Sequence, residues 1–225
     1  IMPSLVGSEM CIRDREYKFF QLKKPHLQKS NRNRQTFKFH FTRMRIISGK
    51  HKGRRITAPK NLPVRPTTDL AKESLFNILN NHYYLDTISV IDLFSGTGNI
   101  AFEFASRGSK NIHAVDGNFN CVKFIDKISN EFDFYINTYK SDVFKFLEKT
   151  ALKTDIIFAD PPYNLEKDKF LKIIEIVFER NLLNDNGILI VEHSKHMDLS
   201  VNDFFNYSKK YGGSVFSFYN ARKEL

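Results

Sequence analysis

Residues 89–107 read SVIDLFSGTGNIAFEFASR, and they carry the strongest indication of the fold class. Val90 to Phe94 is a short apolar run typical of a buried strand, and a helix is expected from about Asn99 to Arg107. Between them, Gly96 and Gly98 allow the backbone to turn sharply. A strand followed at once by a helix is the first half of a strand–helix–strand unit, so the stretch predicts a parallel sheet covered by helices.

The alternation of strand and helix continues toward the C-terminus. Further strands are expected at Asn111–Val115, Phe134–Tyr139, Asp155–Ala159 and Ile188–Val191, and further helices at Phe119–Phe132, Val143–Lys149 and Lys167–Phe178. Two last strand-like runs, Phe204–Tyr211 and Ser214–Tyr219, are joined by Gly212-Gly213, which favours a tight antiparallel turn. The sequence therefore predicts an α/β fold with a doubly wound, mostly parallel sheet of seven strands and a C-terminal antiparallel hairpin.

The segment before this sheet predicts two smaller elements. Residues 44–57, MRIISGKHKGRRIT, hold short apolar pieces on both sides of a glycine-flanked basic segment, as in a β-hairpin. Prolines at 59, 63 and 66 mark an extended link, and a helix is expected from about Asp69 to Asn81. The predicted organisation is a basic hairpin arm at 44–66 followed by the main domain at 67–225.

Composition excludes several classes of protein. Hydrophobic residues make up 41% and charged residues 27% of the 225, which supports a packed core. No run of about 18 apolar residues and no signal-peptide pattern is found, so we expect a cytoplasmic protein. Cys11 and Cys121 do not cluster with histidines, which argues against a structural zinc site. Two distant cysteines also do not make the dense disulfide framework of a small secreted protein.

The positive charge is concentrated near the N-terminus. Residues 1–66 hold 17 Lys and Arg against 3 Asp and Glu, whereas residues 67–225 hold 18 against 22. Such a block is typical of an arm that binds phosphates, and charge alone fits a solvated basic tail equally well. The candidate phosphate-binding residues are Arg45, Lys50, Lys52, Arg54, Arg55 and Arg65.

Residues 1–43 are expected to be foreign to the fold. Residues 1–15, IMPSLVGSEMCIRDR, resemble a translated sequencing-adapter fragment, and the segment that follows is rich in Lys, Arg, Asn and Gln. We expect the native start at Met44, with residues 1–43 as a non-native or disordered extension.

Three acids follow predicted strands and are candidate ligands for a nucleotide-like cofactor. The glycine turn after Asp92 offers free helix N–H groups, although many such turns only connect a strand to a helix. Asp116 ends the next strand, where it could bind ribose hydroxyls or simply belong to a turn. Asp142 could bind an adenine amino group or cap the following helix. Because Ala101 replaces the third glycine of G-x-G-x-x-G, a nicotinamide cofactor is disfavoured.

The loop after the fourth strand carries the most specific signal. Residues 156–164 read IIFADPPYN, and two prolines in succession supply no N–H donor. The carbonyls of Asp160 and Pro161 are then available to accept hydrogen bonds from an exocyclic amino group, while Tyr163 can stack on a base. A rigid turn would explain Pro161 and Pro162 but not the acid and the aromatic residue that flank them.

These motifs carry a resemblance. DPPY at 160–163 resembles the (D/N)PP(Y/F) motif of S-adenosylmethionine-dependent amino methyltransferases, and DLFSGTG at 92–98 resembles their cofactor motif. From Met44 to about Tyr219 the chain is similar to the RsmD family, which methylates the N2 amino group of a guanine in small-subunit (16S) ribosomal RNA. The matching pieces include MRIISGKHKGRRI at 44–56, RPTTDLAKESLFNIL at 65–79 and FADPPY at 158–163.

The resemblance implies a Rossmann-like class I methyltransferase fold with S-adenosyl-L-methionine as cofactor. It assigns Asp92, Gly96 and Gly98 to the methionine part, Asp116 to the ribose and Asp142 to the adenine, and it places the target guanine against Asp160, Pro161 and Tyr163. The full candidate sets are Asp92, Phe94, Gly96, Gly98, Asp116 and Asp142 for the cofactor, and Asp160, Pro161, Pro162 and Tyr163 for catalysis. Asp116 departs from the glutamate usual in the family, which shortens its reach.

The implied partner is 16S rRNA in an assembling small ribosomal subunit. We expect the protein to be a monomer that binds neither a metal ion nor a membrane. Direct in-line methyl transfer is expected, with Asp160 and the Pro161 carbonyl orienting the amino group. Two other functions stay open. A DNA adenine-N6 methyltransferase could use the same loop, although the chain has little room for a target-recognition domain. A catalytically silent RNA-binding protein could keep the fold without the reaction.

Overall fold

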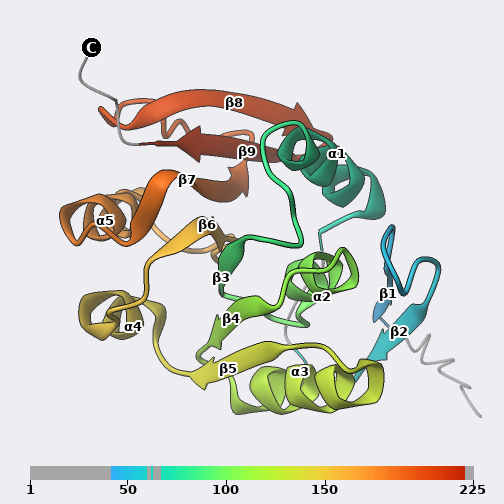
Figure 1. The fold of residues 1–225 in the computed structure, drawn as a ribbon. Helices are drawn as coiled ribbons and strands as arrows, with labels where there is room; N and C mark the ends of the chain where they lie inside the picture. Colours follow the sequence, from blue (N-terminus) through green and yellow to red (C-terminus); the bar gives the residue numbers. More distant parts are fainter. Residues whose placement is uncertain (1–41, 60–61, 63–66, 221–225) are drawn as a thin grey trace, which may run out of the picture. The chain divides into compact units, whose positions relative to one another are not determined.

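The computed structural model describes residues 42–59, 62 and 67–220, which belong to one compact unit (Figure 1). Nearly all of the proposed extension at 1–43 lies outside the described residues, and so does Arg65. The interpretation of residues 1–15 as an artefact therefore stays a prediction. No helix in the described ranges is long and apolar enough to cross a membrane, and no three His, Cys, Asp or Glu side chains there are grouped to hold a metal ion.

The main sheet has seven strands. They are β3 (Ser89–Leu93), β4 (Asn111–Asp116), β5 (Ile136–Lys140), β6 (Thr154–Ala159), β7 (Leu183–Ser194), β8 (Phe205–Tyr211) and β9 (Ser214–Tyr219). Their spatial order is β5-β4-β3-β6-β7-β9-β8. Strands β3 to β7 pair in parallel, and β9 pairs antiparallel with β7 and β8. The predicted doubly wound sheet with its antiparallel end is confirmed.

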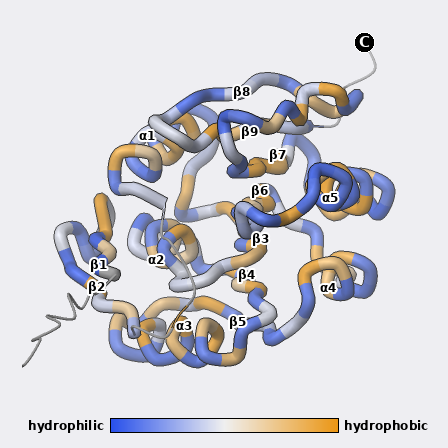
Figure 2. Tube along the Cα trace, turned by 180° about the vertical axis from the view of Figure 1, so that it is seen from behind, coloured by the Kyte–Doolittle hydropathy of each residue, from blue (hydrophilic) through white to orange (hydrophobic). Residues whose placement is uncertain are grey.

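Helices cover both faces of this sheet (Figure 1). On one face lie α1 (Asp69–Asn80), α2 (Asn99–Ser106) and α3 (Phe119–Phe132), and on the other α4 (Val143–Lys149) and α5 (Lys167–Glu179). Successive strand residues supply the two cores, because Val90 packs with the first set and Ile91 with the second. Figure 2 shows the alternation of hydrophilic and hydrophobic residues along α3 that this packing requires.

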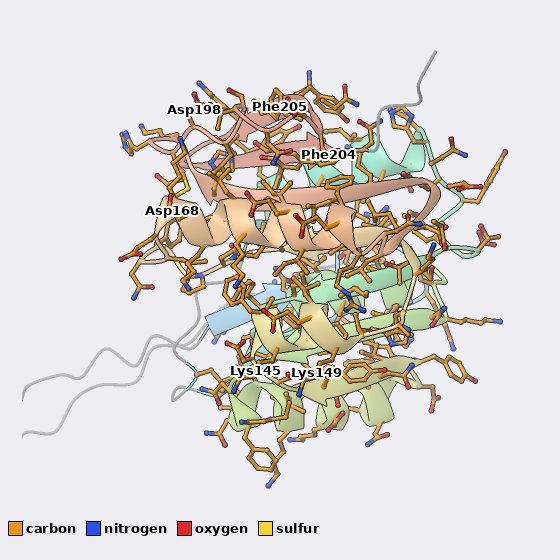
Figure 3. All side chains as sticks on the ribbon, turned by 90° about the vertical axis from the view of Figure 1, so that its left-hand side faces the viewer. Lys145, Lys149, Asp168, Asp198, Phe204 and Phe205 are labelled. Carbon is orange, nitrogen blue, oxygen red and sulfur yellow. The ribbon has the colours of Figure 1, made fainter. Side chains whose placement is uncertain are left out.

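Figure 3 faces α4 and α5, with Lys145 and Lys149 labelled beside α4 and Asp168 beside α5. Here the approach to β8 is fixed by aromatic stacking, because the rings of Phe178 and Phe204 lie 3.9 Å apart and nearly parallel. The C-terminal hairpin is thereby tied to α5.

Two strands begin two or more residues away from the predicted position. Strand β5 begins at Ile136 rather than Phe134, because the Phe134 N–H bonds to the Ser129 carbonyl and completes the end of α3. Strand β7 begins at Leu183, which pairs with Thr154 ahead of a register shift. The apolar run at 188–191 indicated only the regular part of this strand.

The predicted hairpin is present as β1 (Thr42–Arg45) and β2 (Arg55–Ala58), so its first strand begins two residues before Met44. Its residues alternate between two environments. The inward positions, which pack into the core beside α1 and α2, are Met44, Ile46, Ile56 and Ala58. The exposed positions on the strands include Arg43, Arg45 and Arg55.

A buried ion pair fastens this hairpin to α2. Glu103, which is fully buried, accepts hydrogen bonds from the backbone N–H groups of Ile47 at 2.8 Å and Ser48 at 3.0 Å. The Lys72 Nζ lies 3.4 Å from Glu103 Oε2, and the Arg107 Nε donates to Glu103 Oε1 at 2.9 Å. Burial lowers the pKa of Lys72, and the Glu103 carboxylate opposes that shift.

The hairpin loop also touches the end of α2. A Cβ at Gly49 would lie 1.9 Å from the Ser106 carbonyl oxygen, and Gly49 has φ +83°. The Lys50 N–H donates to that same carbonyl at 2.7 Å. Only glycine allows the loop to approach this closely, so the arm has a fixed place relative to the sheet.

Candidate active site

The turn after β3 is built for close approach of a ligand. Phe94, Gly96 and Gly98 all have left-handed backbone angles, with φ of 56°, 53° and 75°. A Cβ at Gly98 would lie 2.9 Å from both the Ile125 and Phe102 side chains, so the α2 N-terminus can pack here only with glycine. Phe94 is the unusual member, since a bulky residue rarely adopts positive φ outside functional turns.

Asp92 lies at the bottom of this turn. Its side chain is buried, and Oδ2 accepts a hydrogen bond from the Ala101 N–H of α2 at 3.2 Å. Burial raises the pKa of Asp92 to about 8, and the Asp116 carboxylate adds to the effect. At neutral pH, Asp92 is therefore largely protonated, and a cationic ligand nearby would favour its ionised form.

Asp116 ends β4 and holds the same turn from the neighbouring strand. Its Oδ2 accepts from the Gly96 N–H at 2.8 Å, and its Oδ1 accepts from the Asn118 N–H at 2.7 Å. Each oxygen keeps further acceptor capacity for a ligand. The carboxylate thus fixes the glycine turn whether or not it also binds a ribose.

Asp142 is the N-cap of α4. Its Oδ1 accepts a hydrogen bond from the Lys145 N–H at 3.0 Å. The capping interpretation is therefore correct, and it is compatible with a ligand role because Asp142 also lines the cavity described next.

A cavity of about 460 Å³ lies at the carboxyl ends of β3, β4 and β6. This volume is typical of a small-molecule site, and the position is the usual one for ligands of doubly wound sheets. Five of the six predicted cofactor residues line it, as do all four predicted catalytic residues, whereas Gly98 does not line the cavity and instead forms the turn into α2. Sequence reasoning did not single out the other lining residues: Thr67, Ser95, Thr97, Asn99, Ile100, Gly117, Asn118, Cys121, Val143 and Phe158.

The loop after β6 forms one side of this cavity. Pro161 is buried, whereas Pro162 is exposed and Tyr163 is 63% exposed. The Leu165 N–H closes the turn on the Pro162 carbonyl at 2.9 Å. Among the hydrogen bonds of the described residues, none ends at the carbonyl oxygen of Asp160 or Pro161, which leaves both oxygens to an outside donor.

Asp160 is a partly buried acid among other acids. Burial raises its pKa well above the usual value, and the charges of Glu192 and Asp92 raise it further. Its backbone N–H points at the Leu93 carbonyl at 3.4 Å, which fixes the loop against β3. The site thus brings an acid, two available carbonyls and an exposed aromatic ring to one edge of a cofactor-sized cavity.

Comparison with known proteins gives the family. Residues 44–220 match the family model described as conserved hypothetical protein 95, which is the RsmD family. The chain belongs to the RsmD family. Its relative YlbH from Bacillus subtilis is 32% identical over 80% of this chain and the whole of that protein. A Buchnera aphidicola relative named "Ribosomal RNA small subunit methyltransferase D" is 29% identical over 70% of this chain and 79% of its own length.

A solved structure of yhhF from Escherichia coli has the same fold. It superposes with a TM-score of 0.69 at 24% identity and covers 79% of this chain and 97% of that one. The prediction of a Rossmann-like methyltransferase fold is confirmed. In this RsmD family member the matched residues run from the hairpin to the last strand, so hairpin and sheet both belong to the family's fold.

The five predicted basic residues of the arm that the structure describes are exposed. Lys50, Lys52 and Arg54 lie in the hairpin loop and Arg55 begins β2. Arg45 differs, because its Nε donates to the Asp69 carboxylate at 3.1 Å, with both side chains about half exposed. Arg45 therefore borders the α1 N-terminus at Asp69. Thr67, two residues before Asp69 in the chain, lines the cavity.

Proposed function

We propose that this protein transfers a methyl group from S-adenosyl-L-methionine to the N2 amino group of a guanine in small-subunit (16S) ribosomal RNA. One observation carries the proposal: Asp160, two available loop carbonyls and Tyr163 stand at the edge of the cavity formed by the glycine turn. The name of the Buchnera relative supports an rRNA substrate. Such a substrate would place the protein in the cytoplasm beside assembling small subunits.

The cavity suits a cationic nucleoside cofactor. Asp116 already accepts backbone N–H groups at the β4 end, and its remaining lone pairs fit ribose hydroxyls. Asp142 lies at the α4 N-terminus, within the part of the wall proposed for the adenine. The buried Asp92 and the partly buried Asp160 favour a positively charged ligand between them. When bound, the cofactor supplies an activated methyl group on sulfonium.

Orientation of the target amino group falls to the loop. The N2 lone pair of guanine is delocalised into the ring, so the protein must direct it toward the methyl carbon. Hydrogen bonds from the amino group to the Asp160 carboxylate and the Pro161 carbonyl would pull the nitrogen toward tetrahedral geometry, which localises the lone pair and points it at the methyl carbon. An ionised Asp160 would also stabilise the positive charge that develops on nitrogen. Tyr163 is exposed enough to stack on the flipped base.

We expect the exposed basic residues of the hairpin to contact the phosphates of the RNA. Arg43 and Arg55 lie on exposed strand positions, and Lys50, Lys52 and Arg54 continue the charge into the loop. Because Glu103 and Gly49 hold the hairpin against α2, phosphates bound there would keep a fixed distance from the cavity. Recognition by shape and backbone charge suits structured RNA.

The Asp160→Ala variant tests this assignment. The variant should keep its fold and its affinity for the cofactor but lose at least about 100-fold in turnover, because a positioned group of the transition state is gone. Methyl transfer to small-subunit RNA and calorimetric cofactor binding are measured on both proteins. Near-normal methylation by the variant would remove Asp160 from the mechanism.

A further inference from the structure

Glu192 is a buried acid that the proposed reaction does not use. In the parallel pair of β6 and β7, Ala159 lies opposite Val191, so the side chains of the next residues, Asp160 and Glu192, project on the same face. Glu192 is 4% exposed, and its Oε2 accepts a hydrogen bond from Thr67 Oγ1 at 3.0 Å. The cavity wall includes Thr67 and Asp160 but not Glu192. Glu192 therefore stands behind the residues that a ligand would touch.

A further acid acts on Asp160. Asp92 faces Asp160 from β3, and its charge adds to that of Glu192 in raising the pKa of Asp160. Burial raises the pKa of Glu192 as well, while hydrogen bonds from Ser214 of β9 and from Thr67 oppose that shift. Glu192 thus has donors that stabilise its ionised form.

The buried cation of α1 is engaged elsewhere. On α1, Lys72 Nζ donates to the Arg45 carbonyl at 2.7 Å and to Asn99 Oδ1 at 2.8 Å, and its charge is paired with Glu103 of α2. Neither Asp160 nor Glu192 has a salt bridge to any described residue. Two neighbouring carboxyls without a cation resist ionising together, so one of them keeps a proton.

We propose that Glu192 is a positioning residue that governs the charge of Asp160. Together with burial, its carboxylate keeps the neighbouring Asp160 carboxyl protonated while the cavity holds no cation, and the arrival of a sulfonium ligand lets Asp160 ionise. The released proton passes to solvent. This inference rests on the proposed function, because it assumes a sulfonium methyl donor. Its consequence is that Asp160 becomes a charged acceptor for the target amino group only when the methyl donor is in place.

Two ligands that differ mainly in the charge on sulfur test this coupling. S-adenosylmethionine is a sulfonium, and S-adenosylhomocysteine is the neutral thioether. Calorimetric titration near neutral pH, in buffers of different ionisation enthalpy, gives the number of protons released on binding each ligand. In the wild-type protein the sulfonium should release more protons than the thioether, by up to about one per site from Asp160.

Substitutions test whether this excess of released protons depends on Asp160 and Glu192. In Asp160→Asn the excess should fall most, because that residue has no proton to lose, and in Glu192→Gln it should fall part of the way, because burial and Asp92 still act on Asp160. Glu192→Asp keeps the carboxyl and should keep most of the excess. Glu175→Gln, the same change on the exposed surface of α5, should leave it unchanged.

The result can overturn the inference in two ways. A Glu192→Gln protein that binds both ligands and keeps the wild-type excess, while Asp160→Asn loses it, would show that Glu192 does not control Asp160. Equal proton release for the two ligands in the wild-type protein would also reject the coupling. A wild-type protein that binds neither ligand would instead reject the proposed cofactor, and the inference with it.

Discussion

Replacing Glu103 by Ala should detach the hairpin arm from the sheet. The change removes the acceptor for the Ile47 and Ser48 N–H groups and leaves the Lys72 ammonium, 1% exposed, without its partner. Each hydrogen bond to a charged group contributes about 1.5–3 kcal/mol, and breaking a buried ion pair costs about 3–5 kcal/mol. Because these terms overlap, we expect the free energy of unfolding to fall by about 3–5 kcal/mol, a large part of a typical total of about 5–15 kcal/mol.

Urea unfolding of the Glu103→Ala protein measures this loss. Glu131→Ala, on the exposed surface of α3, serves as the control and should change stability by less than about 0.5 kcal/mol. Adding Lys72→Met to Glu103→Ala should recover part of the loss, because the unpaired buried charge is then gone. A loss below about 1 kcal/mol for Glu103→Ala alone would refute the view that this ion pair holds the arm.

Three further changes probe the cavity and the arm. Asp92→Asn should gain stability over the wild type as pH rises from about 4 to about 8, because the raised pKa of Asp92 makes its ionised form costly in the folded protein. At 1.36 kcal/mol per pKa unit the upper limit is about 6 kcal/mol, and a difference between the urea midpoints of variant and wild type that is the same at pH 5 and pH 8.5 would contradict it. Asp116→Ala should weaken cofactor binding by about 1–3 kcal/mol, and an unchanged Kd by calorimetry would leave Asp116 with its turn role alone. Replacing Lys50, Lys52, Arg54 and Arg55 by Ala should flatten the salt dependence of RNA binding by up to about 0.7–0.9 per contact while cofactor affinity stays the same, and an unaltered slope would move the RNA site elsewhere.

The parts of this fold that depend on local pattern were predictable from sequence. The apolar run before Asp92, the glycine turn and the regular alternation that follows are local signals, and they predicted the sheet and the edge at which its cavity lies. The loop at Asp160 was recognisable as a candidate site because a rigid turn explains two successive prolines but not the acid and the aromatic residue that flank them. Asp142 shows the limit of such signals, since one residue can cap a helix and line a cavity at once.

The long-range polar contacts were not predicted. Glu103 lies 56 positions from Ile47, and Thr67 lies 125 from Glu192, so no local pattern links either pair. A signal was nevertheless present, because Glu103 interrupts an otherwise apolar helix and Glu192 follows the apolar run of β7. A charged residue at a buried position needs a partner, but the sequence does not say which one.

The most direct test of the proposed function is the identity of the methylated atom. Small ribosomal subunits and 16S rRNA are incubated with the protein and a cofactor that carries an isotopic methyl label, and the RNA is digested to nucleosides for mass spectrometry. We predict labelled N2-methylguanosine with the wild-type protein and almost none with Asp160→Ala. Label on adenine N6, or on no nucleoside while the cofactor still binds, would contradict the assignment of this chain as a guanine-N2 methyltransferase.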